Sequence, residues 1–248
     1  MNILAIDTSL SDISVGCSTS AGMTATRSFK HERDALRRLA GLMKDAMDEV
    51  GISPSDIDVV ACAQGPGSFT GLRVGIAAAK AFADAVGAVM TGVSTLMLLA
   101  MATDTDEGET VVPLIEACVG EAYYGLYAPV SDGGVTALVD DSIMAVQDIS
   151  EWLSGLHLEK YGLDREAIQA QHRHSTPIVM GPAVEKYMEY LSGATVKQDS
   201  NSIRISDLLS IAKAFASAGR TMPAEQFLPD YLRASQAEIR AQMLENRQ

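Results

Sequence analysis

The glycine-rich segment GPGSFTG, residues 65–71, has the composition of a loop that could hold a phosphate group. An apolar segment at 56–64 precedes it and a segment rich in small residues at 72–87 follows, which predicts a strand and a helix. A Walker phosphate loop needs a lysine directly after its last glycine, and here leucine and arginine follow. The dinucleotide pattern Gly-x-Gly-x-x-Gly also fails, because the third glycine comes one residue late. The spacing argues against both standard loops and leaves open only anion binding at the helix N-terminus.

Histidine and cysteine, the usual ligands of a tightly bound transition metal, are few and poorly spaced for that task. The histidines are isolated or two residues apart without a nearby carboxylate, and each cysteine lies in an apolar, strand-like segment. We therefore expect no metal site and no disulfide, and we interpret the cysteines as buried reduced thiols. The residues in question are His31, His157, His172, His174, Cys17, Cys62 and Cys118.

The net charge of −13 argues against independent binding to nucleic acid, which needs a basic surface. No apolar run reaches the roughly 18 residues that a membrane helix requires. The N-terminal residues lack the basic start of a signal peptide, so we expect a cytoplasmic protein without membrane contact.

Two similar series of segments must position these residues. Each series has three strand-like runs followed by a helix and a further strand, which predicts two similar α/β lobes divided at the polar stretch 103–110. A Ser206 cap is expected at the start of the helix at 206–219, and an irregular insertion at 157–175. Strands are expected at 2–9, 12–19, 22–30, 57–63, 88–93, 110–117, 121–130, 134–141 and 176–182, and helices at 31–50, 72–87, 94–102, 146–153, 183–192 and 206–219.

The helix at 72–87 carries two apolar stripes, whereas a helix that faces one core needs one. Either it is buried between layers of its own domain or it meets a partner. Gly71, Gly75 and Ala79 recur every four residues, so another backbone could approach closely. The first stripe comprises Leu72, Gly75, Ile76, Ala79, Phe82 and Ala83, and the second comprises Gly71, Val74, Ala78, Ala81 and Ala85.

Several segments together resemble the TsaB (YeaZ-like) family of bacterial tRNA threonylcarbamoyladenosine biosynthesis proteins. They are MNILAIDTS at 1–9, AQGPGSFTGLRVGIAAAKAFA at 63–83 and GVSTLMLLA at 92–100. The segments EAYYGLY at 121–127 and PDYLR at 229–233 extend the resemblance into the second half.

The resemblance implies an actin/Hsp70-like ATPase (ribonuclease H-like) fold with two similar lobes. Residues 1–103 would form the N-terminal lobe with partner-binding helices, and 104–248 the C-terminal lobe, whose last helix packs back on the first. It implies a non-catalytic scaffold subunit for N6-threonylcarbamoyladenosine (t6A) formation, without a cofactor of its own; a nucleotide at the partner interface is left open. The implied partners are a TsaD-type catalytic subunit, a TsaE-type ATPase, and a second copy when the chain is alone, with tRNA contacted only indirectly.

Comparison with the catalytic TsaD-type paralogues supports this role. Such chains carry a His-x-x-x-His metal pair where this sequence has, approximately, Thr95 and Leu99. Leucine cannot ligate a metal, so the resemblance implies that the catalytic site is absent. The chain departs from the TsaB pattern at Asp34 and at Glu116-Ala117-Cys118, where no catalytic group is expected.

Asp7, Thr8 and Ser9 stand where this fold carries a phosphate loop in its first hairpin. An aspartate at this place often organises magnesium, but the turn lacks the glycine that active members usually show. We expect a degenerate nucleotide cleft at these three residues, with Asp7 capping its own turn as the alternative.

The partner-binding surface is expected on the two helices at 31–50 and 68–87. A metal-dependent peptidase or hydrolase and an independent nucleotide phosphotransferase are the alternative functions. The expected partner-binding residues are Ala35, Leu39, Leu42, Gly71, Leu72, Val74, Gly75, Ala78 and Ala81.

Overall fold

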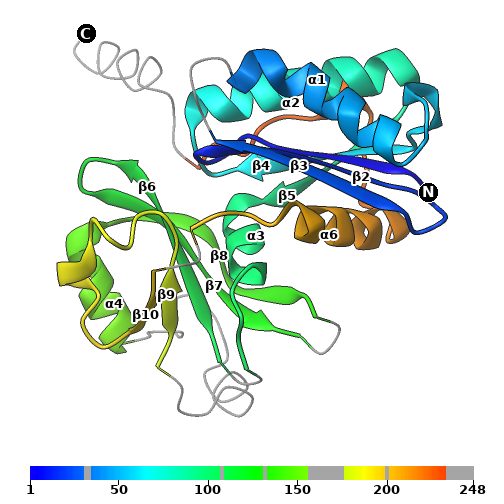
Figure 1. Ribbon diagram of the computed structural model, residues 1–248. Helices are drawn as coiled ribbons and strands as arrows, with labels where there is room; N and C mark the ends of the chain where they lie inside the picture. Colours follow the sequence, from blue (N-terminus) through cyan, green and yellow to red (C-terminus); the bar gives the residue numbers. More distant parts are fainter. Residues whose placement is uncertain (31–34, 107–108, 131–132, 156–175, 199–200, 233–248) are drawn as a thin grey trace, which may run out of the picture.

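The computed structural model describes residues 1–30, 35–106, 109–130, 133–155, 176–198 and 201–232 (Figure 1). Its N-terminal lobe is built on a sheet of five strands in the order β3-β2-β1-β4-β5. The first three strands are antiparallel, and β4 and β5 run parallel to β1. The strands are β1 (Ile3–Asp7), β2 (Asp12–Ser18), β3 (Thr24–Lys30), β4 (Val59–Gly65) and β5 (Val89–Ser94).

The C-terminal lobe repeats this topology in a second sheet with the order β10-β9-β6-β7-β8. Here β6, β7 and β8 are antiparallel, and β9 and β10 run parallel to β6. Because each strand has a counterpart in the first sheet, the structure confirms the prediction of two similar α/β lobes. The strands are β6 (Val111–Cys118), β7 (Glu121–Pro129), β8 (Val135–Ala145), β9 (Ile178–Met180) and β10 (Thr195–Lys197).

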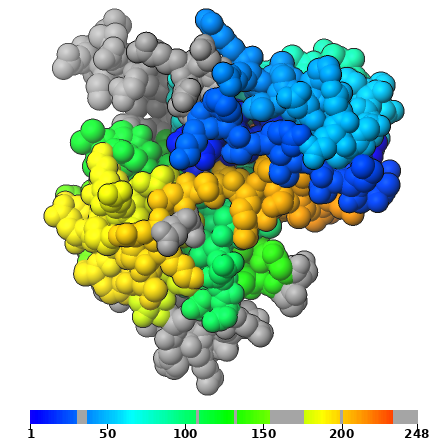
Figure 2. Space-filling model, in the orientation of Figure 1, coloured from blue at the N-terminus to red at the C-terminus, as the bar shows by residue number. Residues whose placement is uncertain are grey.

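Helices cover both faces of the first sheet. Helices α1 (Ala35–Glu49) and α2 (Phe69–Val86) pack on one face, and α6 (Ile205–Ser217) packs on the other. In Figure 2 the orange atoms of α6 lie directly beneath the blue atoms of the first lobe. Each of the first two helices is followed by a glycine in the left-handed region, Gly51 at φ +71° and Gly87 at φ +75°.

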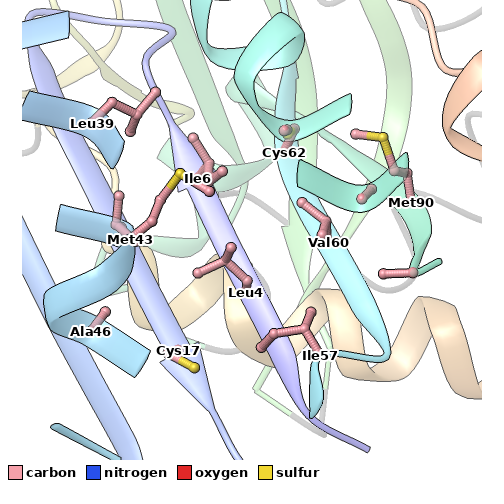
Figure 3. Close-up of a cluster of buried hydrophobic side chains, with 14 of the residues drawn as sticks. Leu4, Ile6, Cys17, Leu39, Met43, Ala46, Ile57, Val60, Cys62 and Met90 are labelled. Atoms are coloured by element: carbon pink, nitrogen blue, oxygen red, sulfur yellow. The ribbon is translucent and has the colours of Figure 1, made fainter. Parts of the chain in front are cut away.

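The central strand β1 is buried on both faces because its side chains alternate between two cores. Leu4 and Ile6 point toward α1 and α2, where Figure 3 shows them beside Leu39 and Met43 of α1. Cys17 and Cys62 belong to the same cluster as buried free thiols, whereas Cys118 is half-buried. The predicted burial is therefore confirmed for Cys17 and Cys62 and is wrong for Cys118.

The opposite face of β1 belongs to a core that both lobes share. Helix α3 (Thr95–Met101) contacts β4 and β5 of the first sheet and β6, β7 and β8 of the second. The fully buried Leu98 and Leu99 of α3 lie in one apolar cluster with residues of both sheets and of α6. Its members include Ile3, Ala5, Val59, Ala61, Val111, Ile115, Tyr127, Met180, Leu208 and Leu209.

The outer face of the second sheet carries a smaller core under α4 (Ile149–Gly155). Trp152 of α4 meets Tyr124 edge to face, with ring centroids 5.1 Å apart. This is the single tryptophan of the chain, so its fluorescence reports on the second lobe.

After α6 the chain returns along the first lobe to the glycine-rich loop. Met222 and Met90 of β5 exchange two backbone hydrogen bonds of 2.8 and 2.9 Å. Phe227 is fully buried in the first core, and the Asp230 amide donates to the Gln64 carbonyl at 2.9 Å. Residues 220–232 therefore bind the edge of the first sheet and end beside residues 65–71.

Two local predictions are wrong. Residues 183–192 form turns and a 3₁₀ helix (Met188–Tyr190) instead of an α-helix, within the short crossover that connects β9 to the parallel strand β10. Ser206 is not a cap: α6 begins at Ile205 after Arg204, whose side chain makes no capping hydrogen bond.

Some predictions fall outside the described residues. They are the start of the first helix at 31–34, most of the insertion at 157–175 and the tail beyond 232. Within the described part of the chain, no helix is both long enough and apolar enough to cross a membrane.

The shared core predicts that both lobes unfold together. Leu98→Ala should lower the free energy of unfolding by about 2–5 kcal/mol, because Leu98 is fully buried where the two sheets meet. Circular dichroism and Trp152 fluorescence in a urea titration should show the same displaced midpoint. An unchanged Trp152 midpoint beside a shifted circular dichroism midpoint would show that the lobes are independent.

Candidate functional site

The glycine-rich loop and α2 lie in direct contact with the β1–β2 turn. A Cβ added to Gly67 would lie 2.3 Å from the Ser9 carbonyl oxygen, and one added to Gly71 would lie 2.1 Å from the Thr8 carbonyl oxygen. At Gly75 it would lie 2.0 Å from Thr8 Oγ1. The close approach that these glycines permit is therefore made by the chain's own turn.

Hydrogen bonds hold the same contact together. The Ser68 amide donates to the Ser9 carbonyl at 2.8 Å, and Thr8 Oγ1 donates to the Gly71 carbonyl at 2.8 Å. Ser68 is the N-cap of α2, and its Oγ accepts from the Gly71 amide at 3.2 Å. Two amides at this helix end are thus already bonded within the chain, which weakens the case for an anion site there.

Asp7 caps its own turn, which was the alternative to a nucleotide role. Its side chain is 3% exposed, and Oδ1 accepts from the Ser9 amide at 2.9 Å and from Ser9 Oγ at 2.6 Å. Burial raises the pKa of Asp7 to about 6, and the two hydrogen bonds from Ser9 oppose that shift.

A cleft of about 420 Å³ opens between the lobes next to the glycine-rich loop. Asp7, Thr8 and Ser9 do not line it, because Gly67 and Gly71 pack against Thr8 and Ser9. These three residues lie buried behind the loop instead of facing this cleft, and a nucleotide role for them stays a prediction. The cleft is lined by Pro66, Gly67, Ser68, Phe69, Leu72, Ile115, Glu116, Ala117, Cys118, Tyr123, Asp230, Tyr231 and Leu232.

The expected partner-binding residues divide by exposure. Four of them, Leu39, Gly71, Leu72 and Gly75, are buried within the first lobe and do not lie on the exposed side of α1 and α2. Leu39 and Leu72 pack in the core of the first lobe, and Gly71 and Gly75 lie against Thr8. Leu42, Val74 and Ala78 are half-buried, Ala81 is exposed, and Ala35 begins α1, with its side chain outside the described residues.

An apolar groove of about 340 Å³, which was not predicted from the sequence, lies between α1 and α2. Met43 and Met47 belong to the core stripe of α1, yet they also line this groove together with Phe82 of α2. The second apolar stripe on α2 is the sequence feature from which this groove could have been predicted. The groove is lined by Ala40, Met43, Lys44, Met47, Asp48, Pro54 and Phe82.

The positions compared with a metal-binding pair are apolar in their surroundings. Thr95 and Leu99 are fully buried in the shared core, and Thr95 Oγ1 has no hydrogen-bond partner among the described atoms. In the part of the chain that the structure describes, no group of three or more His, Cys, Asp and Glu side chains could hold a metal ion. All four histidines lie outside that part.

A polar cluster that the sequence did not reveal joins the two lobes. Ser94, the N-cap of α3, donates its hydroxyl to Asp141 of β8 and accepts from the Met97 amide at 3.1 Å. Tyr127 of β7 donates its hydroxyl to the same carboxylate. Burial raises the pKa of both Tyr127 and Asp141. These hydrogen bonds give the polar side chains at one edge of the shared core their partners.

The glycine contact predicts a large loss of stability on adding one methyl group. Gly71→Ala should lower the free energy of unfolding by about 2 kcal/mol or more, because the new Cβ would collide with the Thr8 backbone. Gly41→Ala is the matched control, since Gly41 is an exposed α1 residue with nothing within 4 Å of a Cβ. It should raise stability by about 0.5–1 kcal/mol. Equal stability of the two variants in urea titrations would contradict this packing.

Asp7 predicts a pH dependence of known sign. A folded-state pKa of about 6, raised from 3.8, means that the folded chain holds the proton more tightly. The contribution of Asp7 to the free energy of unfolding should therefore fall as the pH rises from about 4 to 6 and stay constant above pH 6. Asp7→Asn keeps an acceptor for Ser9 and should stabilise the chain by about 1–3 kcal/mol above pH 6, with little effect at pH 4.

Thermal unfolding at pH 4, 5, 6 and 8 checks the Asp7 prediction. The control is Asp84→Asn on the exposed surface of α2. An Asp7→Asn profile that runs parallel to the wild-type profile would show that Asp7 does not carry this burial cost.

Comparison with known proteins shows which family the chain resembles. The model of the family described as "TsaD: tRNA N6-adenosine threonylcarbamoyltransferase" matches residues 30–241. The chain is 37% identical to the Escherichia coli tRNA threonylcarbamoyladenosine biosynthesis protein TsaB over 131 residues, 51% of this chain and 55% of that protein. It is 27% identical to the Bacillus subtilis protein of the same name over 240 residues, 97% of each chain.

Solved structures give the same result. A Pseudomonas aeruginosa structure, described as an uncharacterized protein with similarity to peptidase YeaZ, has a TM-score of 0.77 and 27% identity, covering 94% of this chain and 99% of that one. YeaZ from the same organism gives 0.72 and 27% identity, covering 93% and 99%. The chain therefore belongs to the TsaD family, of the tRNA N6-adenosine threonylcarbamoyltransferase type, and is a TsaB/YeaZ-like member of it.

Proposed function

We propose that the chain is a TsaB-type accessory subunit for the formation of t6A in tRNA. It acts by binding a TsaD-type catalytic subunit through the exposed side of α1 and α2. The names of the Escherichia coli and Bacillus subtilis relatives support the pathway, and the second match runs through 97% of both chains.

The observation that carries the proposed mechanism is the surface of α1 and α2. Small residues are exposed along both helices, and small side chains allow a partner helix to come close. The apolar groove between the helices offers a place for a larger partner side chain. The exposed small residues are Ala40, Gly41, Ala77, Ala81 and Ala85.

A non-catalytic role fits the side chains at α3. Thr95 and Leu99 lie in the apolar shared core, and leucine has no atom that can ligate a metal. A metal-dependent peptidase, the alternative function, would need such ligands. The Pseudomonas aeruginosa description mentions similarity to a peptidase and no metal. The catalytic groups therefore belong to the TsaD-type partner.

The net charge of −13 supports placing the tRNA on the partner rather than on this chain. A TsaE-type ATPase joins the resulting cytoplasmic complex, and any nucleotide lies at the interface with the partner. Without the partner, two copies associate through the same α1–α2 surface, since an apolar groove favours burial.

Ala81→Glu tests the docking surface. Ala81 is exposed, so the fold should survive, whereas the half-buried Ala78 also packs against the chain's own core. A carboxylate buried at the interface should weaken binding to the TsaD-type subunit at least about thirtyfold and reduce t6A formation in the reconstituted system. Titration of the labelled chain with the partner measures the affinity.

Ala214→Glu on α6 is the matched control, because it places the same charge on an exposed helix outside the proposed surface. It should bind like the wild type. If Ala81→Glu binds as tightly as Ala214→Glu, the partner docks elsewhere; if t6A forms equally well without this chain, the accessory role is wrong.

A further inference from the structure

Exposed apolar side chains gather around the mouth of the cleft between the lobes. Phe69 at the start of α2 is 44% exposed and Tyr231 is 42% exposed, and both line the cleft. Val119, which follows the lining residue Cys118 at the tip of the β6–β7 hairpin, is 90% exposed. These side chains come from both lobes, and an exposed cluster of this kind is typical of a binding surface.

The walls of this cleft are held in place by packing and hydrogen bonds within the chain. Its apolar lining includes the buried Leu72 and Ile115, one from each lobe. The Phe69 and Tyr231 rings pack together with centroids 5.4 Å apart. The Asp230 backbone is held on the first lobe by its bond to Gln64, and its carbonyl oxygen would lie 2.7 Å from a Cβ at Gly65. The surface is therefore largely preformed, which lowers the entropic cost of binding.

The charge of the lining selects the ligand. Glu116 and Asp230 line the cleft, and no Lys, Arg or His is among its described lining residues. Lys186 pairs with Glu116, but no described residue forms an ion pair with Asp230. Asp230 lies near enough to Asp141 to contribute to the raised pKa of that carboxyl. Among the described lining residues, a polyphosphate would meet the carboxylates of Glu116 and Asp230 and no cationic side chain.

Arg73 does not change this conclusion. Its guanidinium lies 4.5 Å from the centroid of the Phe69 ring, yet it does not line the cleft. It shows instead that the Phe69 face accepts a cation, as aromatic rings in general do. An incoming cationic side chain would find a second ring of this kind in Tyr231 and a carboxylate in Asp230.

We propose that this cleft is a second docking site, separate from the α1–α2 surface, for a protein segment that places an apolar side chain next to a lysine or arginine. The apolar side chain lies against Leu72 and Ile115, and the cation lies between Asp230 and the Tyr231 ring. The site does not rest on the proposed function, because it follows from the lining alone.

Blocked tripeptides test the proposal on the full-length chain without any TsaD-type protein, so failure here leaves the proposed function untouched. The probes are acetyl-Phe-Arg-Leu-amide, acetyl-Phe-Glu-Leu-amide and MgATP. Their binding is measured from nuclear magnetic resonance shifts of the isotope-labelled chain. The arginine peptide should shift Phe69, Val119 and Tyr231 and bind on the order of tenfold more tightly than the glutamate peptide.

Asp230→Asn should reduce that preference about two- to fivefold, the usual effect of one exposed charge pair. Asp148→Asn, an exposed aspartate of the second lobe that does not line the cleft, is the matched control and should keep the wild-type preference. Tyr231→Ala should weaken the arginine peptide, and the folded spectrum of each variant confirms that it is intact.

Three outcomes would overturn the proposal. Equal binding of the two peptides would remove the charge argument, and tighter binding of MgATP at the same residues would make the cleft an anion site. Binding only after truncation behind Leu232 would show that the chain's own last sixteen residues occupy the cleft.

Discussion

The contact of helix α2 with the β1–β2 turn is the constraint on which the first lobe depends. A helix can approach a turn this closely only where side chains are missing, and Gly67, Gly71 and Gly75 are missing theirs on the side that faces Thr8 and Ser9. The contact sets the position of the helix N-terminus, buries Asp7 and fixes which side of α2 faces solvent. The surface proposed for the partner is thus the side of α2 that does not pack against the β1–β2 turn.

The shared core has a comparable effect on the relation between the lobes. Proteins built of two lobes can open and close around a ligand by hinge or shear motion. Here α3 and α6 join both sheets in one apolar cluster, and the cluster of Ser94, Tyr127 and Asp141 bonds the lobes at its edge. Separating the lobes would expose this core to water, so the arrangement favours a rigid scaffold. A rigid scaffold can present fixed surfaces to partners, which suits both binding sites proposed above.

Much of the architecture could be predicted from the sequence. The repeated order of strands predicted two similar lobes, and the apolar runs located all strands except β10, which has only three residues. Local pattern failed at 183–192, where helical spacing of apolar residues occurs in a series of turns. The spacing of apolar residues cannot distinguish a helix from a series of turns whose apolar residues face the same core.

The candidate site shows the same limit more sharply. The sequence by itself determined that residues 65–71 are not a standard phosphate loop and that α2 has more apolar surface than one core requires. Only the tertiary structure decided what covers that surface, because Thr8 and Ser9 are more than fifty residues from the helix and no local pattern links them. The same holds for the cleft, whose walls come from three distant segments that meet only when both lobes are folded.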